Sequence, residues 1–153
     1  MNEVVIRNAV FNDLDTLLRL EQMLIEEERT FDETLEPVNA FYYDFDEMMS
    51  NAGVKLIVAE INQEIIGTGY ARIRDAAPFL NYKKYIYLGF MYVLPSWRNK
   101  GVNKKIIERL KQWTISKNIS EVRLDVYYEN KVAVKAYTKS GFSGHVLEMR
   151  LPV

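Results

Sequence analysis

The spacing of apolar residues along the chain changes several times between the period of a helix and the period of a strand. Residues 3–9 alternate and predict a strand. The next segment has apolar residues three and four positions apart, which predicts a helix from about residue 13 to about residue 29, with Asn12 or Asp13 as its N-cap. A short second helix is predicted over residues 40–50.

The middle of the chain has the β-branched and aromatic composition of strands. Three strands are predicted, over residues 54–61, 64–74 and 82–94. Only two polar residues, Asn62 and Gln63, separate the first strand from the second, which is the length of a tight hairpin turn. This part of the chain therefore predicts an antiparallel meander.

The helical period returns in the last third of the chain. Asn130 is placed to cap the N-terminus of the last helix, and Gly141 is placed to close its C-terminus. The elements predicted here are a helix over about 101–117, a strand over 120–128, a helix over 130–142 and a strand over 144–153.

This order of elements predicts an α/β fold of the mixed (α+β) type, with a central, mostly antiparallel sheet and helices on both faces. A helix connects the strand that ends at residue 94 to the strand that begins near residue 121, so these two strands are expected to be parallel near neighbours. The 153 residues suffice for one core, and no repeat or low-complexity tract marks a linker. We therefore expect a single domain over residues 1–153.

Composition and charge remove several classes of function. The formal net charge is −1, so a basic nucleic-acid-binding face is not expected. The chain has no cysteine, which excludes thiolate nucleophiles and zinc–cysteine sites, and its single histidine, His145, cannot form a metal cluster alone, so no metal is expected. Neither a secretion leader nor an apolar run of about 18 residues is present, and we expect a cytoplasmic protein without membrane contact.

Four cationic residues gather in the turn before the helix that starts near residue 101. These residues are Arg98, Lys100, Lys104 and Lys105, and Gly101 lies among them. A helix N-terminus presents unpaired N–H groups and the positive end of the helix dipole, so this turn suits an anion. The alternative reading is a solvated helix start. The glycine-rich patterns of nucleoside-triphosphate and dinucleotide sites are absent.

Two spaced motifs resemble the GNAT superfamily of acyl-CoA-dependent N-acyltransferases. Val93-Leu94-Pro95 followed by Arg98-x-x-Gly101 is similar to the strand end and pyrophosphate loop of that family, and the chain departs from the family pattern at Asn103, where Gly or Ala is usual. The larger Asn103 side chain either crowds a pyrophosphate or donates a hydrogen bond to it. The second motif consists of Asn130, Ala133, Tyr137, Gly141 and Phe142.

The resemblance implies that acetyl-CoA is the co-substrate and that its pantetheine arm lies between two splayed strands. It implies main-chain contacts from Met91 and Val93, and a main-chain N–H there that stabilises the thioester oxygen as it becomes an oxyanion. The further cofactor-binding residues that it implies are Arg98, Asn99, Lys100, Gly101, Val102, Asn103, Lys104 and Asn130.

For the chemistry, the resemblance implies that Tyr137 is the acid that protonates the leaving thiolate. The alternative is that Tyr137 is a packing aromatic. Many relatives carry a glutamate as base on the strand before the loop, but residues 85–93 contain no acid and Tyr87 stands near that position. The base is left open between a water chain and the acids of other segments, namely Glu21, Glu26, Glu27, Glu28, Asp44, Asp46, Asp125 and Glu129.

The expected reaction is acetyl transfer to a primary amine by direct transfer in a ternary complex. Acidic and aromatic residues in the first two helices favour a small cationic amine, an aminoglycoside-like amine or a lysyl group as acceptor. The alternatives are a binding module that holds acyl-CoA without turnover and an assembly domain in which Tyr42, Tyr43 and Phe45 pack against a second subunit. A homodimer is one expected partner state.

Overall fold

The computed structural model describes residues 2–153, and the structural statements below concern these residues. Its strands are β1 (Val5–Asn8), β2 (Val54–Ile61), β3 (Glu64–Asp75), β4 (Lys84–Val93) and β5 (Val122–Leu124). Its helices are η1 (Phe11–Asp13), α1 (Leu14–Glu28), α2 (Phe45–Ser50), η2 (Pro95–Trp97), α3 (Val102–Ser116) and α4 (Lys131–Lys139).

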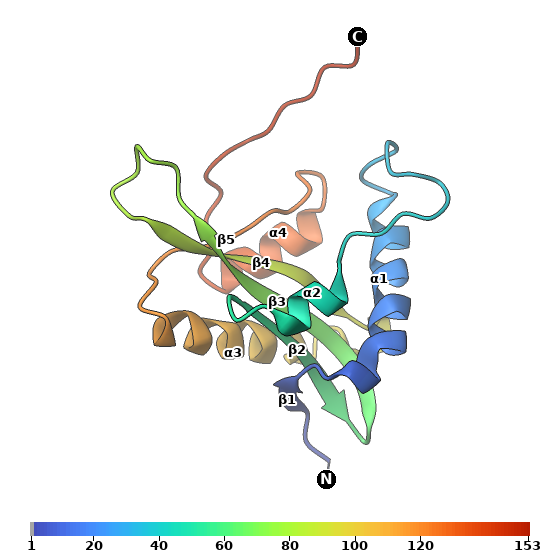
Figure 1. Cartoon of the computed structure of the whole chain (residues 1–153). Coiled ribbons are helices and arrows are strands. Elements are labelled where there is room, and N and C mark those ends of the chain that lie inside the picture. The colour runs from blue at the N-terminus through green and yellow to red at the C-terminus, as the bar shows by residue number, and fades with distance from the viewer. Residues whose placement is uncertain (1) are drawn as a thin grey trace.

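The five strands form one sheet in the order β1-β2-β3-β4-β5, and Figure 1 shows how it twists. The first three pairings are antiparallel, and the pairing of β4 with β5 is parallel. The helix between those two strands is α3. The predicted mixed sheet with one parallel crossover pair is therefore confirmed.

The turn between β2 and β3 is a tight hairpin turn, and the β2–β3 register shifts a few residues before it, between Ala59 and Glu60. Asn62 and Gln63 both have positive φ, 51° and 64°. Two successive residues in this region make the type of two-residue turn whose twist matches that of the flanking strands. Asparagine tolerates the left-handed region better than most residues, so the positive φ of Asn62 costs little free energy.

Helices cover both faces of the sheet, as predicted. On one face α1 and α2 pack against β2, β3 and β4, and on the other face α3 packs against the same strands. The first core contains Leu17, Leu20, Phe45, Met48, Leu56, Val58, Ile65, Tyr70, Phe90 and Tyr92. The second contains Ile57, Ala59, Ile66, Ala71, Ile86, Leu88, Val93, Val102, Ile106 and Leu110. Each fully buried side chain of this size stabilises the fold by about 1.5–3 kcal/mol.

The first helix lies where it was predicted, but its N-cap works differently. Asp13 occupies the cap position, yet its side chain makes no capping bond to α1. Its carboxylate accepts from the N–H of Val10 at 2.8 Å and from the Arg7 guanidinium at 2.8 Å and 3.0 Å. The contact with Arg7 lowers the pKa of Asp13. Asp13 therefore ties β1 to the first turn of η1 instead of capping the long helix.

Three predicted elements differ most from the structure. The second helix spans Phe45–Ser50 and not residues 40–50, because Asp44 caps it by accepting from the N–H of Glu47 at 3.1 Å. The strand predicted over residues 120–128 is short, since β5 pairs with β4 only over Val122–Leu124. The strand predicted over residues 144–153 does not form, because this segment has no strand beside it.

Both predicted caps of α4 are confirmed. The Asn130 side chain accepts from the N–H of Ala133 at 3.2 Å. Gly141 has a φ of 99°, and the N–H of Phe142 next to it donates to the carbonyl of Tyr137 at 3.0 Å. The helix itself ends at Lys139, earlier than predicted.

Gly89 is expected to be required for packing. A Cβ at this position would collide with the ring and hydroxyl of Tyr70, which is itself buried against neighbouring aromatic rings. We expect Gly89→Ala to lower the free energy of unfolding by about 1–3 kcal/mol, the usual cost of overpacking a core. Urea denaturation measures this loss. Gly144→Ala is the control, because nothing lies within 4 Å of its added methyl group, and equal stability of the two variants would contradict the prediction.

Candidate functional site

The parallel pair β4–β5 opens into a fork. Pairing runs only from Ile86–Leu88 on β4 to Val122–Leu124 on β5, although β4 continues to Val93. The N–H of Leu94 donates to Ile66 of β3 at 2.9 Å. Because main-chain groups alternate in direction along a strand, Met91 and Val93 direct theirs to the opposite, open edge. The predicted splay of these two strands is therefore present.

A bulge in β4 lies at the point where the fork opens. The β3–β4 register shifts between Thr68 and Tyr70, and Phe90 has a φ of 50°. For an aromatic residue this conformation is strained by about 1–3 kcal/mol and needs support from its surroundings. The Thr68 hydroxyl donates to the Phe90 carbonyl at 2.8 Å, and the Phe90 N–H donates to the Tyr43 hydroxyl at 3.1 Å. Both polar groups of the strained residue are thus satisfied by side chains.

The tyrosine that holds the bulge is itself held from α1. Glu21 is fully buried, and its Oε2 accepts from the N–H groups of Tyr42 and Tyr43 at 2.9 Å and 2.8 Å. Its other oxygen has no hydrogen-bond partner among the described residues. Burial raises the pKa of Glu21, because a carboxylate is costly to remove from water. A continuous series of contacts therefore links α1 to the bulge.

The cationic turn presents a row of unused main-chain donors. No described group accepts a hydrogen bond from the N–H of any of residues 99–104. Gly101 has a φ of 81°, and nothing lies within 4 Å of the position that its Cβ would take. Val102 is buried and anchors the start of α3 in the core. The turn is thus rigidly attached and open to an anion at its main chain.

The cationic side chains of the turn are less available than the sequence suggested. Arg98 donates through Nε to the carbonyl of Val93 at 2.8 Å and through Nη2 to Glu27 of α1 at 2.8 Å. Lys100 lies over the ring of Trp97 at 5.0 Å. Arg98 therefore occupies the Val93 carbonyl, so the open edge offers the N–H of Val93 but not its C=O in this conformation.

Acidic and aromatic side chains face the last helix. Tyr137 is half-buried, with its ring against that of Phe142 at 5.8 Å. Burial raises the pKa of Tyr137 to about 12, and the charge of Glu28 contributes. We call the group the acidic–aromatic cluster, and it consists of Glu28, Asp32, Tyr42, Tyr127 and Tyr137.

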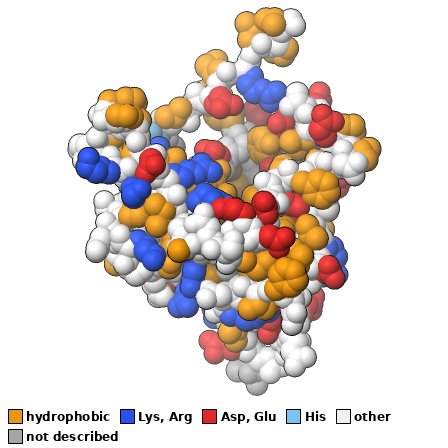
Figure 2. Space-filling view, in the orientation of Figure 1, with side chains coloured by type: hydrophobic (Ala, Val, Ile, Leu, Met, Phe, Trp, Pro, Cys, Tyr) orange, Lys and Arg blue, Asp and Glu red, His pale blue; other side chains and the backbone are white. Residues whose placement is uncertain are grey.

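Hydrogen bonds connect members of the cluster. Tyr42 donates to Glu28 at 3.4 Å, and Tyr127 donates to Asp32 at 3.4 Å. Burial raises the pKa of Glu28, and the nearby Asp32 adds to the shift. Figure 2 shows this face of the molecule hollowed between the β3–β4 loop and the loop after α1, with both acidic and basic side chains on the rim.

The structure shows the surroundings of several other acids that the sequence left open as candidate bases. Glu21 is buried beneath the Tyr42–Tyr43 main chain, and Glu27 is paired with Arg98. Tyr87, in the position expected for a glutamate, donates to Asp125 at 3.1 Å. Glu28 is the one of these acids whose charge raises the pKa of Tyr137.

Sequence reasoning missed the contributions of Thr68 and Tyr43 to the bulge. A lone threonine within an apolar strand gives no signal of its own. In the sequence Tyr43 belongs to an aromatic run, and such a run does not indicate that the Tyr43 hydroxyl reaches β4. The Gly-Phe pair at residues 89–90 was the only local sign of an irregular strand.

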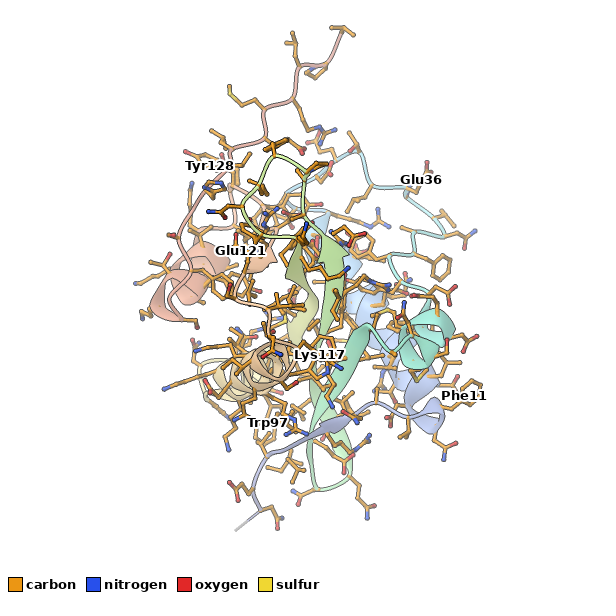
Figure 3. The ribbon with its side chains drawn as sticks, turned by 60° about the vertical axis from the view of Figure 1, so that its left-hand side comes forward. Phe11, Glu36, Trp97, Lys117, Glu121 and Tyr128 are labelled. Carbon is orange, nitrogen blue, oxygen red and sulfur yellow. The ribbon has the colours of Figure 1, made fainter. Side chains whose placement is uncertain are left out.

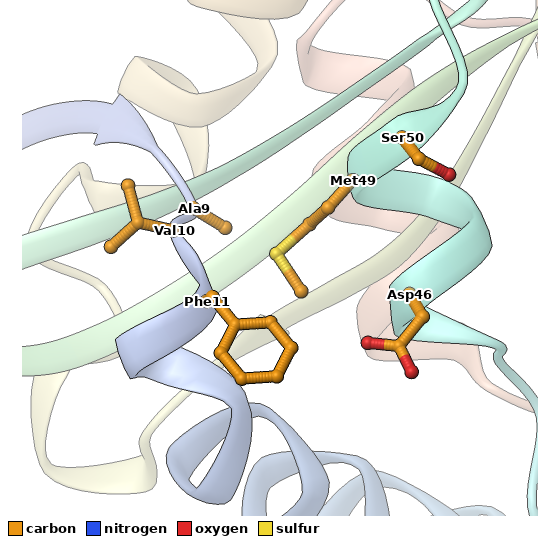
Figure 4. A pocket seen from close by; sticks show the side chains of 6 residues that line it. All are labelled: Ala9, Val10, Phe11, Asp46, Met49 and Ser50. Atoms are coloured by element: carbon orange, nitrogen blue, oxygen red, sulfur yellow. The ribbon is translucent and has the colours of Figure 1, made fainter.

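A second hollow lies between the segment after β1 and α2, and Asp46, one of the acids left open as the base, is the one candidate site residue in its lining. It is lined by Ala9, Val10, Phe11, Asp46, Met49 and Ser50, and Figure 4 shows the Phe11 ring beside Met49. No three acidic or histidine side chains among residues 2–153 are arranged to hold a metal ion. Nor does any helix in this range have the length and apolar character needed to cross a membrane.

Comparison with known proteins gives consistent matches. Residues 18–142 match the acetyltransferase (GNAT) family. The thialysine N-epsilon-acetyltransferase of Sus scrofa is 32% identical over 151 residues, which covers 92% of this chain and 85% of that protein. The aminoglycoside N(6')-acetyltransferase type 1 of Salmonella typhimurium is 28% identical over 107 residues, covering 69% of this chain and 74% of that protein.

A solved structure shares the fold. The predicted acetyltransferase from Clostridium acetobutylicum, crystallised with acetyl-CoA, superimposes with a TM-score of 0.78 at 22% identity. The superposition covers 98% of this chain and 96% of that protein. The fold therefore persists where little of the sequence is shared.

The buried carboxyl group of Glu21 predicts a pH dependence of stability. Its pKa is raised in the folded state, so its contribution is complete below the pKa of the unfolded chain and is lost as pH rises through the folded value. We expect Glu21→Gln, which cannot ionise, to become more stable relative to the wild type as pH increases. Urea denaturation between about pH 4 and pH 8 measures the difference.

The exposed Glu33→Gln serves as the control, since Glu33 lies on the surface. Its difference from the wild type should stay flat over the same range. A flat difference for Glu21→Gln as well would mean that the buried carboxyl group does not titrate with a raised pKa.

Proposed function

This chain belongs to the acetyltransferase (GNAT) family, and from that premise we propose that it transfers an acetyl group from acetyl-CoA to a small cationic amine. The observation that carries the proposal is the row of unused N–H donors at residues 99–104 beside the open edge of β4. The donors suit a pyrophosphate, and the edge suits the amides of an extended arm. Few ligands other than CoA carry a pyrophosphate joined to an extended arm with amides.

The residues present fit acetyl-CoA. The missing Cβ at Gly101 leaves open space at the turn, and the N–H groups of residues 99–104, which donate to no described acceptor, suit an anion. Met91 and Val93 offer main-chain groups along the fork. The Asn130 oxygen is used by its own helix cap, so only its amide NH₂ is available to a ligand.

Acetyl-CoA supplies the activated acetyl group as a thioester. The chain supplies a fixed N–H at Met91, which follows the bulge and lies on the open edge. A donor held in advance at this point stabilises negative charge on the thioester oxygen without reorganisation during the reaction. Thr68 and Tyr43 serve as positioning residues, since they hold the main chain from which this donor projects.

Tyr137 is proposed as the acid. A pKa of about 12 keeps its hydroxyl protonated at neutral pH, so it can donate a hydrogen bond to a developing thiolate. Glu28 lies close enough to contribute to that pKa, and its own raised pKa makes it a better proton acceptor near neutral pH than an ordinary glutamate. We assign Glu28 the role of receiving the proton of the amine, directly or through water.

The acidic–aromatic cluster supports a cationic acceptor. The carboxylate of Glu28 attracts a positive charge, whereas that of Asp32 is already paired with Arg150 at 3.3 Å. The rings of Tyr42 and Tyr127 offer cation–π contact. The amines named for the relatives, an aminoglycoside and thialysine, are of this chemical kind. Direct transfer in a ternary complex follows if both substrates meet at the fork. We further propose that residues 1–153 act as one cytoplasmic domain.

Acetyl-CoA should bind to the wild type in calorimetry, and Gly101→Asp should weaken binding about 100-fold, about 2.7 kcal/mol. The variant places a carboxylate where the phosphates are proposed to lie. Gly101→Asn is the matched control, because asparagine has the same size, no charge and tolerance for the positive φ at this position. Equal affinity of all three proteins would refute the placement of the pyrophosphate.

Tyr137→Phe should lower kcat by about 100-fold or more while the KM for acetyl-CoA stays nearly unchanged, because the hydroxyl acts in the transition state. Release of CoA measures turnover, and the absence of protein thiols removes background. Tyr128→Phe is the control, since Tyr128 is exposed. Unchanged turnover in Tyr137→Phe would exclude it as the acid.

The same assay with a panel of neutral, singly charged and multiply charged amines tests the acceptor class. Equal rates across the panel would remove the cationic preference. Binding of acetyl-CoA without turnover of any amine would favour the alternative of a non-catalytic acyl-CoA-binding module.

A further inference from the structure

Charged and aromatic side chains on the α1/α2 face of the sheet reach solvent near the β3–β4 loop. Arg72 and Arg74 alternate with Ile73 along β3, so they lie on the same face as Tyr70. Tyr87 of β4 packs against the same core. Arg74 is exposed and Tyr87 is half-buried. Figure 2 shows basic as well as acidic side chains around the hollow beside this loop, so a ligand has access to them.

Arg74 differs from two other arginines of β3 and β5 in having no carboxylate beside it. Arg72 pairs with Glu47 at 2.7 Å, and Arg123 pairs with Glu121 at 3.5 Å. Figure 3 labels Glu121 close to the β3–β4 hairpin. Among residues 2–153 no carboxylate is paired with Arg74. Its charge is therefore available to a group outside the chain.

The ring of Tyr87 holds the Arg74 guanidinium in place. The guanidinium carbon lies 3.8 Å from the ring centroid. A guanidinium that stacks on a ring keeps its N–H donors at its edges, where they form a fork that matches the two oxygens of a carboxylate. A side chain that is already held loses less entropy when it binds a ligand. Arg74 is therefore well prepared for an anionic group.

An unpaired carboxylate lies at the other end of the same tyrosine. Asp125 directly follows β5, and its Oδ2 accepts from the Tyr87 hydroxyl at 3.1 Å. Asp125 is exposed, and no cation in the part of the chain that the structure describes pairs with it. Tyr87 thus has a free cation over its ring and a free anion at its hydroxyl. We call Arg74, Tyr87 and Asp125 the head-group site.

The head-group site lies close to the fork between β4 and β5. The last paired residue of β5 is Leu124, so Asp125 lies at the level of Gly89, where the fork begins. The proposed oxyanion donor, the N–H of Met91, is two residues further along β4, which is about 6–7 Å. A ligand bound across Tyr87 therefore reaches the proposed thioester position with a chain of a few carbon atoms.

Aromatic rings connect the head-group site to the acidic–aromatic cluster. The Tyr87 ring lies 6.3 Å from that of Tyr70, and the Tyr70 ring lies 5.7 Å from that of Tyr43. The next ring is Tyr42, at 5.7 Å from Tyr43, and its hydroxyl donates to Glu28. The proposed proton acceptor and the two free charges therefore belong to one continuous group of side chains.

We propose that the acceptor is a free α-amino acid with a second amine at the end of its side chain, and that Arg74 binds its α-carboxylate while Asp125 binds its α-ammonium group. This inference rests on the proposed acetyl transfer and specifies the substrate class. One carbon atom separates the two head-group charges of such a molecule, as one tyrosine separates their two partners here. The side chain then carries the second amine to the fork.

The transfer keeps the balance of atoms proposed above. The side-chain amine forms a bond to the thioester carbon, and the C–S bond breaks. The proton of the amine goes to Glu28, directly or through water, and the leaving thiolate takes a proton from Tyr137. A polyamine or an aminoglycoside has no carboxylate, so it would bring positive charge to Arg74 without pairing it.

Three acceptors with the same terminal amine test the head group. L-Lysine has both head-group charges, Nα-acetyl-L-lysinamide resembles a lysyl residue in a peptide and has neither, and cadaverine lacks only the carboxylate. We expect kcat/KM for L-lysine to exceed that for the other two by about 10–100-fold, the effect of hydrogen bonds to a charged group. CoA release measures the rates. Equal values, or a preference for cadaverine, would overturn the proposal.

Variants of Arg74 test whether this residue produces the preference. Arg74→Gln should largely abolish the preference for L-lysine over cadaverine, and Arg74→Lys should retain part of it. A merely structural role of Arg74 would lower both rates and preserve their ratio, which would contradict the proposal. Arg109→Gln is the control, because Arg109 is equally exposed but lies on α3, across the sheet. It should keep the ratio of the wild type.

Calorimetry without turnover separates this inference from the proposed acetyl transfer. L-Lysine is titrated into the wild type and into Arg74→Gln with CoA present. Binding that is about 10-fold or more weaker in the variant supports the head-group site even if no amine is acetylated. Turnover of amines that depends on neither the carboxylate nor Arg74 retains the acetyl transfer and overturns the head-group site, as does a wild type that does not bind L-lysine.

Discussion

The strained main chain at Phe90 is the constraint on which the site depends. Its positive φ and the register shift beside it turn β4 away from β5, so the strand beyond them presents free polar groups instead of a completed ladder. A conformation that costs about 1–3 kcal/mol persists only where the surroundings stabilise it. Here the hydroxyls of Thr68 and Tyr43 satisfy the two polar groups of the same residue from different elements.

Those supports are themselves part of the core, which explains the dense packing around them. The Tyr43 ring lies 4.9 Å from that of Phe90 and 5.7 Å from that of Tyr70. Gly89 leaves the space that Tyr70 fills. Glu21 holds the main chain of Tyr43 from the interior of α1. The family's chemistry is thus built on a packed region whose members contact no proposed substrate, and their contribution is geometric.

Local sequence patterns were sufficient to predict most helices and strands and the outline of the candidate site. Periodicity located α1, β2, β3, β4 and α3, and the caps of α4 followed from Asn130 and Gly141. What could not be predicted depends on partners distant in sequence. Arg98 bonds to Glu27, 71 positions away, and this contact turns its charge away from the proposed phosphate position. The extent of β5 and the state of residues 144–153 depend on which edge is available, and no pattern within one segment specifies that.

The proposed cofactor contacts come from main-chain groups at Met91, Val93 and residues 99–104, and this has an evolutionary consequence. Selection on such a site acts on backbone path, so side chains there can be replaced while the ligand is kept. Asn103, a half-buried residue at which the chain departs from the family pattern that it resembles, is consistent with such a replacement. The solved relative with 22% identity and a TM-score of 0.78 shows how far sequence drifts while the path is preserved. Divergence of acceptor preference among relatives can therefore proceed on a conserved frame.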